Sequence, residues 1–293
     1  MTEIQLAIFV QVAEQQSFTA AAQRLAISQS AVSHAISVLE KELDVRLFRR
    51  TKSDVELTDI GARILLRARE LIGIYETIRQ EAADAKGLRS GTLRIGSFGP
   101  TASLKLLPPL LSEFKKRYPN VEVYIDEGPD QDVLTWIRDR RVDVGFVVLP
   151  EERFKTVHLV TDQMLAVLPQ NHPLASAPAI PLESLCDLPF VLTEAGSAKI
   201  VMELFAKHQL TPKIRYRSSQ VISTLAHIQR GEAVTIVAEM ALPVMGNEGI
   251  EGVVALPLKP AIKRDVGLAY HNERQVSPVT QAFVKLASSM FNQ

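Results

Sequence analysis

The stretch "SQSAVSHAIS", Ser28–Ser37, predicts a helix that begins at Ser28 and has two different faces. Serine is a favoured N-cap residue because its hydroxyl accepts a hydrogen bond from a free N–H of the first turn. Apolar residues then recur at spacings of three or four, which predicts an inward face of Val32, Ile36, Leu39 and Leu43. The outward face carries no formal charge and consists of Gln29, Ser30, Ser33, His34 and Ser37.

Two further helices are predicted before this one. The segment "LAIFVQVA", residues 6–13, places Leu6, Phe9, Val10 and Ala13 on one helical face. Ser17 offers an N-cap for "FTAAAQRLA", in which Ala21, Ala22 and Leu25 allow close packing. A capped helix, a short turn and a second capped helix together indicate a helix-turn-helix.

A basic hairpin is predicted directly after these helices, in "DVRLFRRTKSDVELT". Leu47–Phe48 and Val55–Leu57 have the composition of two short strands around the polar turn Lys52-Ser53-Asp54. Four positive charges fall within seven residues, at Arg46, Arg49, Arg50 and Lys52. The first sixty residues hold six basic and eight acidic residues, so the positive charge is local to this wing.

The outward face of the Ser28–Ser37 helix and the basic wing are suited to different tasks in binding duplex DNA. Glutamine pairs with adenine through two hydrogen bonds, and serine bonds several base edges. Arginines on the wing and the helix N-termini at Ser17 and Ser28 suit phosphates, which supply affinity rather than sequence preference. The predicted DNA-binding residues are therefore Gln29, Ser30, Ser33, His34, Ser37, Arg49, Arg50 and Lys52. The alternative is that the serines are only caps and the arginines only solvated surface.

A long helix is predicted from an N-cap at Thr58 to Gly87, because the segment contains no proline. Ile64, Ala68, Leu71, Tyr75 and Ile78, followed by Ala82 and Ala85, alternate spacings of four and three, which is a heptad seam. A helix of this size reaches roughly 40–45 Å, too long for sixty residues to cover. We therefore expect a homodimerisation helix; a core helix packed on its own chain is the alternative. "KGLRSG", residues 86–91, predicts a glycine cap and a hinge.

Strands and helices alternate over the remaining two hundred residues, which predicts α/β structure with parallel strands. "TLRIGSF", "VEVYIDE" and "VDVGFVV" are expected strands of a first lobe, and "FVLTE", "KIRYRS" and "AVTIVA" of a second. The late strand "DVGLAYH" and a final helix around "VTQAFVKLASSMF" are expected to return to the first sheet.

Two hydroxyl-bearing turns lie where a strand ends and a helix begins, the usual place for a ligand in such folds. Their free N–H groups suit a carboxylate or another small anion. The predicted effector-binding residues are Ser97, Phe98, Gly99 and Thr101 in the first turn, and Thr193, Gly196 and Ser197 in the second. The alternative is that these hydroxyls only cap helices.

Composition restricts the class of protein further. The 33 basic and 33 acidic residues balance, and 46% of the residues are hydrophobic, as in soluble globular proteins. Cys186 is alone, and the six histidines are scattered without metal-ligand spacing, so we expect no metal, no cofactor and no catalysis. The N-terminus does not resemble a secretory signal, and no apolar run spans a membrane, which predicts a cytoplasmic protein.

The segment "FVQVAEQQSFTAAAQRLAISQSAVSHAISVLEKELDVRLFRRT", followed by "LTDIGA", resembles the LysR-type transcriptional regulators. The resemblance implies that Gln29, Ser30, Ser33 and His34 read bases, that Arg50 lies in the wing, and that Ser97, Thr101, Thr193 and Ser197 line an inducer pocket between two periplasmic-binding-protein-like lobes. It also implies an interrupted inverted repeat with T and A at its ends, a homotetramer built from two dimers, and an effect on RNA polymerase.

The expected layout is a winged helix-turn-helix at 1–58, a linker helix and hinge at 59–91, lobe I at 92–163 with 266–293, and lobe II at 164–265. The chain departs from the family at Ser30, where proline is common, and around Glu232 and Glu239, whose carboxylates would weaken a simple preference for anions. A cationic or zwitterionic effector is therefore an alternative to an anionic one. The rival functions are a constitutive DNA-binding regulator and a solute-binding protein; the winged N-terminus argues against the latter.

Overall fold

The computed structural model describes residues 1–50, 55–84, 90–194, 196–242, 251–272 and 276–291. These residues form two compact units. The first consists of Met1–Gly91 with Asp139–Arg141, and the second of Thr92–Arg138 and Val142–Gln293. The first unit encloses one cluster of buried apolar side chains, and the second encloses two.

The first unit contains three short helices, α1 (Glu3–Gln15), α2 (Phe18–Leu25) and α3 (Gln29–Leu43). The two predicted caps are present: Ser17 Oγ accepts from Ala20 N at 3.2 Å, and Ser28 Oγ accepts from Ala31 N at 3.1 Å. The core that joins the three helices is fully buried at Phe9, Val12, Ala21, Val32, Ile36 and Leu39. The predicted helix-turn-helix is therefore confirmed.

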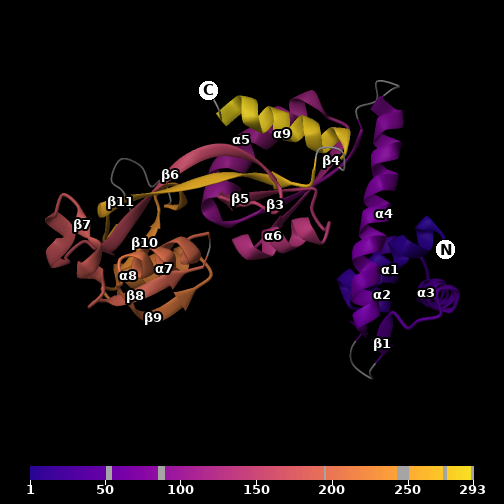
Figure 1. The fold of residues 1–293 in the computed structure, drawn as a ribbon, viewed down its shortest axis with the longest axis horizontal. Helices are drawn as coiled ribbons and strands as arrows, with labels where there is room; N and C mark the ends of the chain where they lie inside the picture. Colours follow the sequence, from indigo (N-terminus) through magenta and orange to yellow (C-terminus); the bar gives the residue numbers. More distant parts are fainter. Residues whose placement is uncertain (51–54, 85–89, 195, 243–250, 273–275, 292–293) are drawn as a thin grey trace. The chain divides into compact units, whose positions relative to one another are not determined.

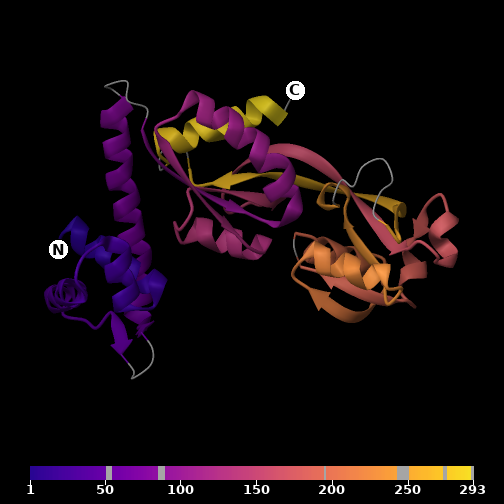
Figure 2. The ribbon, with the colours of Figure 1, turned by 180° about the vertical axis from the view of Figure 1, so that it is seen from behind.

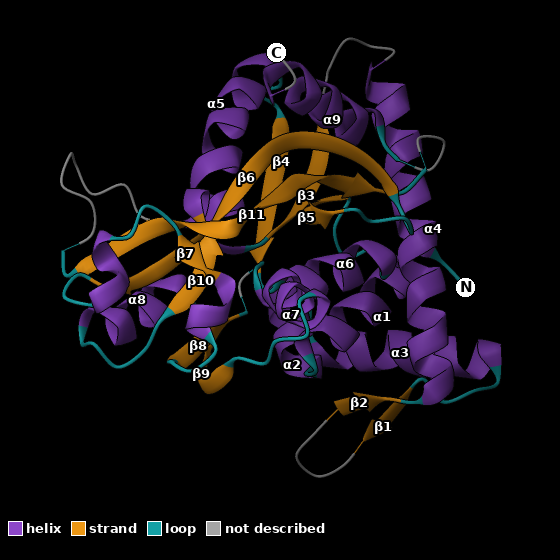
Figure 3. Cartoon of the chain, turned by 60° about the vertical axis from the view of Figure 1, so that its left-hand side comes forward, coloured by secondary structure: helices purple, strands orange, loops and turns teal. Residues whose placement is uncertain are grey.

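The wing is an antiparallel pair of strands, β1 (Phe48–Arg50) and β2 (Val55–Leu57), in which Phe48 is opposite Leu57 (Figure 3). Its first strand begins one residue later than the sequence predicted. The reason is that both backbone groups of Leu47 are bound elsewhere: its N–H donates to Glu40 at 2.8 Å and its carbonyl accepts from Thr58 N at 3.0 Å.

The long helix α4 (Asp59–Asp84) has Thr58 as its N-cap, as predicted, and its predicted end at Gly87 lies outside the described residues. Thr58 Oγ1 accepts from Gly61 N at 3.0 Å and donates to the carbonyl of Arg46 at 2.7 Å, which joins the helix start to the base of the wing. The backbones approach so closely that a Cβ on Gly61 would lie 2.1 Å from the Leu47 carbonyl oxygen. Glycine is therefore required at this contact.

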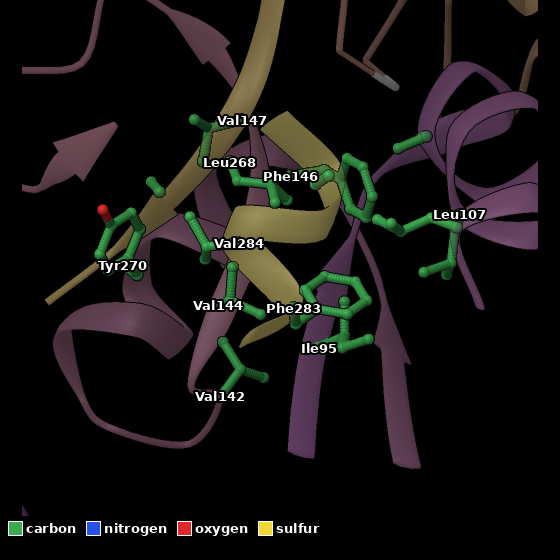
Figure 4. Close-up of a cluster of buried hydrophobic side chains, with 14 of the residues drawn as sticks. Ile95, Leu107, Val142, Val144, Phe146, Val147, Leu268, Tyr270, Phe283 and Val284 are labelled. Carbon is green, nitrogen blue, oxygen red and sulfur yellow. The ribbon is translucent and has the colours of Figure 1, made fainter. Parts of the chain in front are cut away.

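Lobe I, the first half of the second unit, is built on strands β3 (Gly91–Ser97), β4 (Val121–Glu127) and β5 (Val144–Leu149). Helices α5 (Leu107–Arg117) and α9 (Pro278–Phe291) cover one face of the sheet and α6 (Asp130–Arg138) covers the other (Figure 1). Figure 2 shows the same layers from behind. Side chains of β3, β5, β11 and α9 meet in its core, including Ile95, Val144, Phe146, Leu268 and Phe283 (Figure 4).

Lobe II contains β7 (Ile180–Pro181), β8 (Pro189–Thr193), α7 (Ala198–Lys207), β9 (Lys213–Ser218), α8 (Val221–Gln229) and β10 (Thr235–Ala238). Strands β8 and β9 are parallel, and the bridge between Phe190 and Val234 connects them to β10. Its core includes Phe190, Phe205, Leu225 and Val237, and forms a cluster distinct from that of lobe I.

Two long antiparallel strands, β6 (Lys155–Pro169) and β11 (Val253–Tyr270), belong to both lobes. The sheet order is β10-β6-β11-β5-β3-β4, with β7 also on β11. The predicted return of the last strand to the first sheet is confirmed by the pairing of β11 with β5. The expectation of parallel strands holds for β3 with β5, but the sheet is mixed because these two connecting strands run antiparallel. Along them the core changes from one cluster to the other between Val160 and Met164, and between Ile262 and Val266.

We predict that Gly61→Ala lowers the free energy of unfolding by about 1–3 kcal/mol, because the new methyl group overlaps the Leu47 carbonyl. The matched control is Gly73→Ala on the same helix, where a Cβ meets nothing within 4 Å. That change should stabilise the protein by about 0.5–1 kcal/mol, through helix propensity. Urea unfolding of both variants measures the difference; equal effects would contradict the proposed contact.

Candidate DNA interface and interlobe centre

The outward face of α3 presents uncharged polar side chains to solvent. Gln29, Ser30, His34 and Ser37 are exposed, while Ser33 is half-buried. Gln29 Nε2 donates to Ser33 Oγ at 2.9 Å, which links two of the predicted base-reading residues one turn apart. The structure thus brings all five predicted residues of this helix onto one surface.

The wing is attached to α3 by Glu40, a residue that the sequence analysis missed. Glu40 is only 6% exposed, and its Oε1 accepts from Leu47 N at 2.8 Å and Phe48 N at 3.3 Å. Its Oε2 accepts from Arg46 at 2.9 Å. The signal was present, because Glu40 follows the inward Ile36 by one helical turn and so occupies a core position. Part of the positive charge counted on the wing is therefore matched by a buried carboxylate.

The other predicted phosphate-binding residues lie on β1 and beyond it. Arg49 is exposed on β1. Arg50 pairs through its backbone with Val55, but its side chain and all of Lys52 lie outside the described residues.

The structure divides the predicted seam of α4 into two parts. Ala68 is buried and Ile64 packs against the core of the first unit. The rest of the seam faces solvent: Leu71, Tyr75 and Ile78 are 49%, 42% and 58% exposed. Ile74, at 56%, joins them on the same side of the helix. The exposed apolar stripe of α4 therefore starts at Leu71, because the upstream turns pack on α1.

The two predicted effector turns meet around one buried arginine, Arg264. The predicted residues Ser97, Phe98, Thr101, Thr193 and Ser197 are all 0–2% exposed. Arg264 Nη2 donates to Thr101 Oγ1 in lobe I at 2.7 Å, and Nη1 donates to the carbonyl of Gly196 in lobe II at 2.8 Å. The hydroxyls of Ser97 and Thr193 are instead bonded within their own lobes, to Ser103 and Thr224, both at 2.8 Å.

Arg264 is neutralised by Asp162, which lies directly opposite it on the neighbouring strand. The Nη2–Oδ2 distance is 2.8 Å and both side chains are 1% exposed. Burial lowers the pKa of the guanidinium, while the charge and hydrogen bond of Asp162 oppose that change. An arginine remains protonated in any case. We call Thr101, Asp162, Gly196, Ser197 and Arg264 the interlobe centre.

Local backbone geometry allows the two turns to approach. Gly196 has φ +70°, and a Cβ there would lie 2.5 Å from the Phe98 ring and 3.2 Å from Arg264 Nη1. Gly99 also has a positive φ, of 50°. Thr101 begins a single π-helical turn, Thr101–Leu106, an irregularity that is frequent at functional sites. Both glycines predicted for the site therefore have a structural reason to be glycine.

The sequence analysis did not identify Asp162 or Arg264. It considered instead that the carboxylates of Glu232 and Glu239 would weaken the preference of the site for anions. Glu232 is held on the surface of lobe II by Arg230 at 2.8 Å and His227 at 2.7 Å, which lower its pKa to about 2. Glu239 is exposed. The acidic groups at the centre are Asp162 and, nearby, Asp130, where burial raises the carboxyl pKa and the charge of Arg264 is among the opposing effects.

Among the described residues, no group of three or more His, Cys, Asp or Glu side chains is arranged to hold a metal ion. In the same residues, no helix is both long and apolar enough to cross a bilayer.

A winged helix-turn-helix joined to a two-lobed α/β unit defines a DNA-binding regulator with a ligand-binding domain. Residues 4–62 match the bacterial regulatory helix-turn-helix protein, lysR family, and residues 86–292 match the LysR substrate binding domain. The chain therefore belongs to the LysR family, and it is a DNA-binding transcriptional regulator with an effector-binding substrate domain.

Three relatives illustrate the similarity. The uncharacterized HTH-type transcriptional regulator YvbU of Bacillus subtilis is 38% identical over 292 residues, 99% of each chain. A full-length single-residue variant of OxyR from Pseudomonas aeruginosa superposes with a TM-score of 0.77 at 24% identity, over 99% of this chain and 97% of that one. Full-length CbnR complexed with target DNA gives 0.65 at 22% identity over 99% of each. At 24% and 22% identity, the OxyR and CbnR structures support only the fold of this chain.

We predict that the Asp162–Arg264 pair shows strong energetic coupling. Arg264→Met and Asp162→Leu should each lower the free energy of unfolding by about 3–5 kcal/mol, because each leaves a buried charge unpaired. The double variant, which buries no charge, should lose less than the sum of the two. Strictly additive losses in urea unfolding would show that the two groups do not interact.

Proposed function

We propose that this regulator reads double-stranded DNA with the uncharged face of α3 and grips the phosphates with its wing. Gln29, Ser30, Ser33, His34 and Ser37 would contact base edges, while Arg49, Arg50 and Lys52 hold the backbone. The observation that carries the proposal is the exposure of four of these α3 residues on a helix whose apolar face is fully packed. The CbnR–DNA complex supports duplex DNA as the partner.

The target is an interrupted inverted repeat, read by a homodimer that assembles through α4. The exposed stripe of Leu71, Ile74, Tyr75 and Ile78 supports this, because its spacings of three, one and three residues make one continuous face. Ala68 and Ile64 contribute by supporting the helix on its own domain. Two such dimers form the homotetramer. The domain arrangement is 1–58 for DNA, 59–91 for the linker, and the two lobes beyond it.

The lobes respond to a small-molecule effector at Ser97, Phe98, Gly99, Thr101, Thr193, Gly196 and Ser197. The effector must bind one arrangement of the lobes about 1–3 kcal/mol more favourably than the other. That difference would alter the complex with DNA and, through it, the effect on RNA polymerase. Arg264 supports this role, because it binds both turns at once. The protein acts in the cytoplasm and performs no catalysis.

A second candidate is a constitutive regulator whose lobes exchange no ligand. The specific observation in its favour is the burial of the effector-site hydroxyls, which are 0–2% exposed. Calorimetric titration with small metabolites separates the two, since only the first candidate binds one and changes its affinity for DNA.

We predict different consequences for a reading residue and a gripping residue. Gln29→Ala should cost about 1–3 kcal/mol on the cognate site and little on random duplex, because base contacts carry sequence preference. Arg49→Ala should weaken binding to all sequences and reduce the salt slope by about one. Titrations at several salt concentrations measure both. If each variant loses as much affinity for random duplex as for the cognate site, the proposed difference in role between α3 and the wing is wrong.

We predict that Leu71→Asp abolishes the dimer, because it places a carboxylate in the exposed apolar stripe. Leu71 is 49% exposed within the chain, so the change should leave the fold intact. The control is Gly73→Asp, two residues along and roughly 200° around the helix. Sedimentation should give a lower mass for the first variant and an unchanged mass for the second; unchanged masses for both would remove α4 from the interface.

A further inference from the structure

A short segment between α3 and the wing, Arg46-Leu47, is bound by polar groups from two helices. From the last turn of α3, Glu40 accepts from Leu47 N at 2.8 Å and from Arg46 Nη1 at 2.9 Å. At the start of α4, Thr58 N donates to the Leu47 carbonyl at 3.0 Å, and Thr58 Oγ1 donates to the Arg46 carbonyl at 2.7 Å. We call Glu40, Arg46, Leu47, Thr58 and Gly61 the α3–α4 joint.

The second bond of the Thr58 hydroxyl is not needed to cap α4. A cap requires only that Oγ1 accept from the first turn of the helix, as it does from Gly61 N at 3.0 Å. The same oxygen donates its proton to the Arg46 carbonyl, which lies outside the helix. An aspartate would also cap the helix, yet an ionised carboxylate has no proton to donate. Thr58 therefore begins α4 and also binds it to the segment that follows α3.

The bonds of the joint are buried and directional. Glu40 is 6% exposed and Leu47 is fully buried, and Gly61 brings the backbone of α4 against the Leu47 carbonyl. Apolar packing between helices has no preferred direction, whereas hydrogen bonds, above all those to a carboxylate, hold a defined geometry. Because Glu40 belongs to α3 and Thr58 begins α4, these bonds fix the angle between the reading helix and the long helix.

We propose that the α3–α4 joint sets the separation between half-sites that the regulator accepts, with Glu40 and Thr58 as positioning residues. This inference rests on the proposed function, in which a dimer formed through α4 reads an inverted repeat. In such a dimer, each α3 is related to the α3 of the partner through two α4 helices and their joints. The angle at the joint therefore determines a distance along the DNA.

The dimensions of α3 show how strongly the angle at the joint affects that distance. Gln29 and Ser33 precede Glu40 on α3 by roughly 10–17 Å, at about 1.5 Å per residue. An angular change of about 10° would move groups roughly 15 Å away by about 2.6 Å, and the symmetric change in the partner would double the effect. One base pair advances the duplex by about 3.4 Å. A loose joint would thus accept half-sites one base pair nearer or farther, whereas a stiff joint rejects them.

The test uses the full-length protein and a duplex that the wild type selects from a random library. One base pair inserted or deleted at the centre of this duplex shifts a half-site by about 3.4 Å and turns it by about 35°. Wild type and Thr58→Ser, which keeps both hydroxyl bonds, should bind the altered duplexes about tenfold more weakly than the selected one. Thr58→Asp, which keeps only the cap, and Glu40→Gln, which replaces the acceptor for Arg46 by an N–H donor, should lose less than about threefold. Fluorescence anisotropy titrations measure these ratios.

A control variant separates positioning from a general loss of stability. Val12→Ala removes two methyl groups at a fully buried position on α1, outside the joint, and should keep the ratio of the wild type. The proposal is overturned if Thr58→Asp and Glu40→Gln distinguish the duplexes as sharply as the wild type does, or if Val12→Ala loses the distinction to the same extent as they do. A wild type that binds all three duplexes equally would instead refute the proposed reading of an inverted repeat itself.

Discussion

The buried ion pair between Asp162 and Arg264 is the interaction on which the two-lobed unit depends. It lies where β6 and β11 leave one core and enter the other, and it is the point at which a side chain of the connecting strands binds both lobes. Removing either partner leaves a charge in a place that water does not reach. The pair therefore joins the two lobes through a few directed bonds, from Arg264 to Thr101 and to the carbonyl of Gly196.

Local sequence signals predicted the helices of the first unit. Serine caps at Ser17 and Ser28, a threonine cap at Thr58 and regularly spaced apolar residues determine where its helices start and which faces they bury. The second strand of the wing was predicted with its observed bounds, whereas the first begins one residue later and ends two residues later than predicted. The difference arose at Leu47, because its backbone is held by Glu40 and Thr58 rather than by the other strand. Contacts of that kind connect residues distant in sequence, and no local pattern encodes them.

The interlobe centre was only half predictable for the same reason. Hydroxyls that follow a strand and precede a helix marked both turns, and the structure places Thr101 and Gly196 on one arginine. Arg264 and Asp162 were overlooked because each is a polar residue at the edge of a predicted lobe, where no ligand-binding turn was expected. Arg264 alternates with Ile262 and Val266, and Asp162 alternates with Val160 and Met164. This alternation would have assigned both residues to the buried face of a strand. Strand β6 itself was not recognised, so the partnership could not be seen.

The central claim, that the buried pair holds the lobes together, is tested most directly by the distance between the lobes. Spin labels on exposed Lys115 of α5 and Lys207 of α7, each changed to Cys in a Cys186→Ser background and diluted with unlabelled protein, report that distance by pulsed electron resonance. We expect a single narrow distribution for the otherwise native chain, and a broader or longer one when Arg264→Gln removes the bonds to both lobes. Identical distributions in the two proteins would contradict the role assigned to this pair.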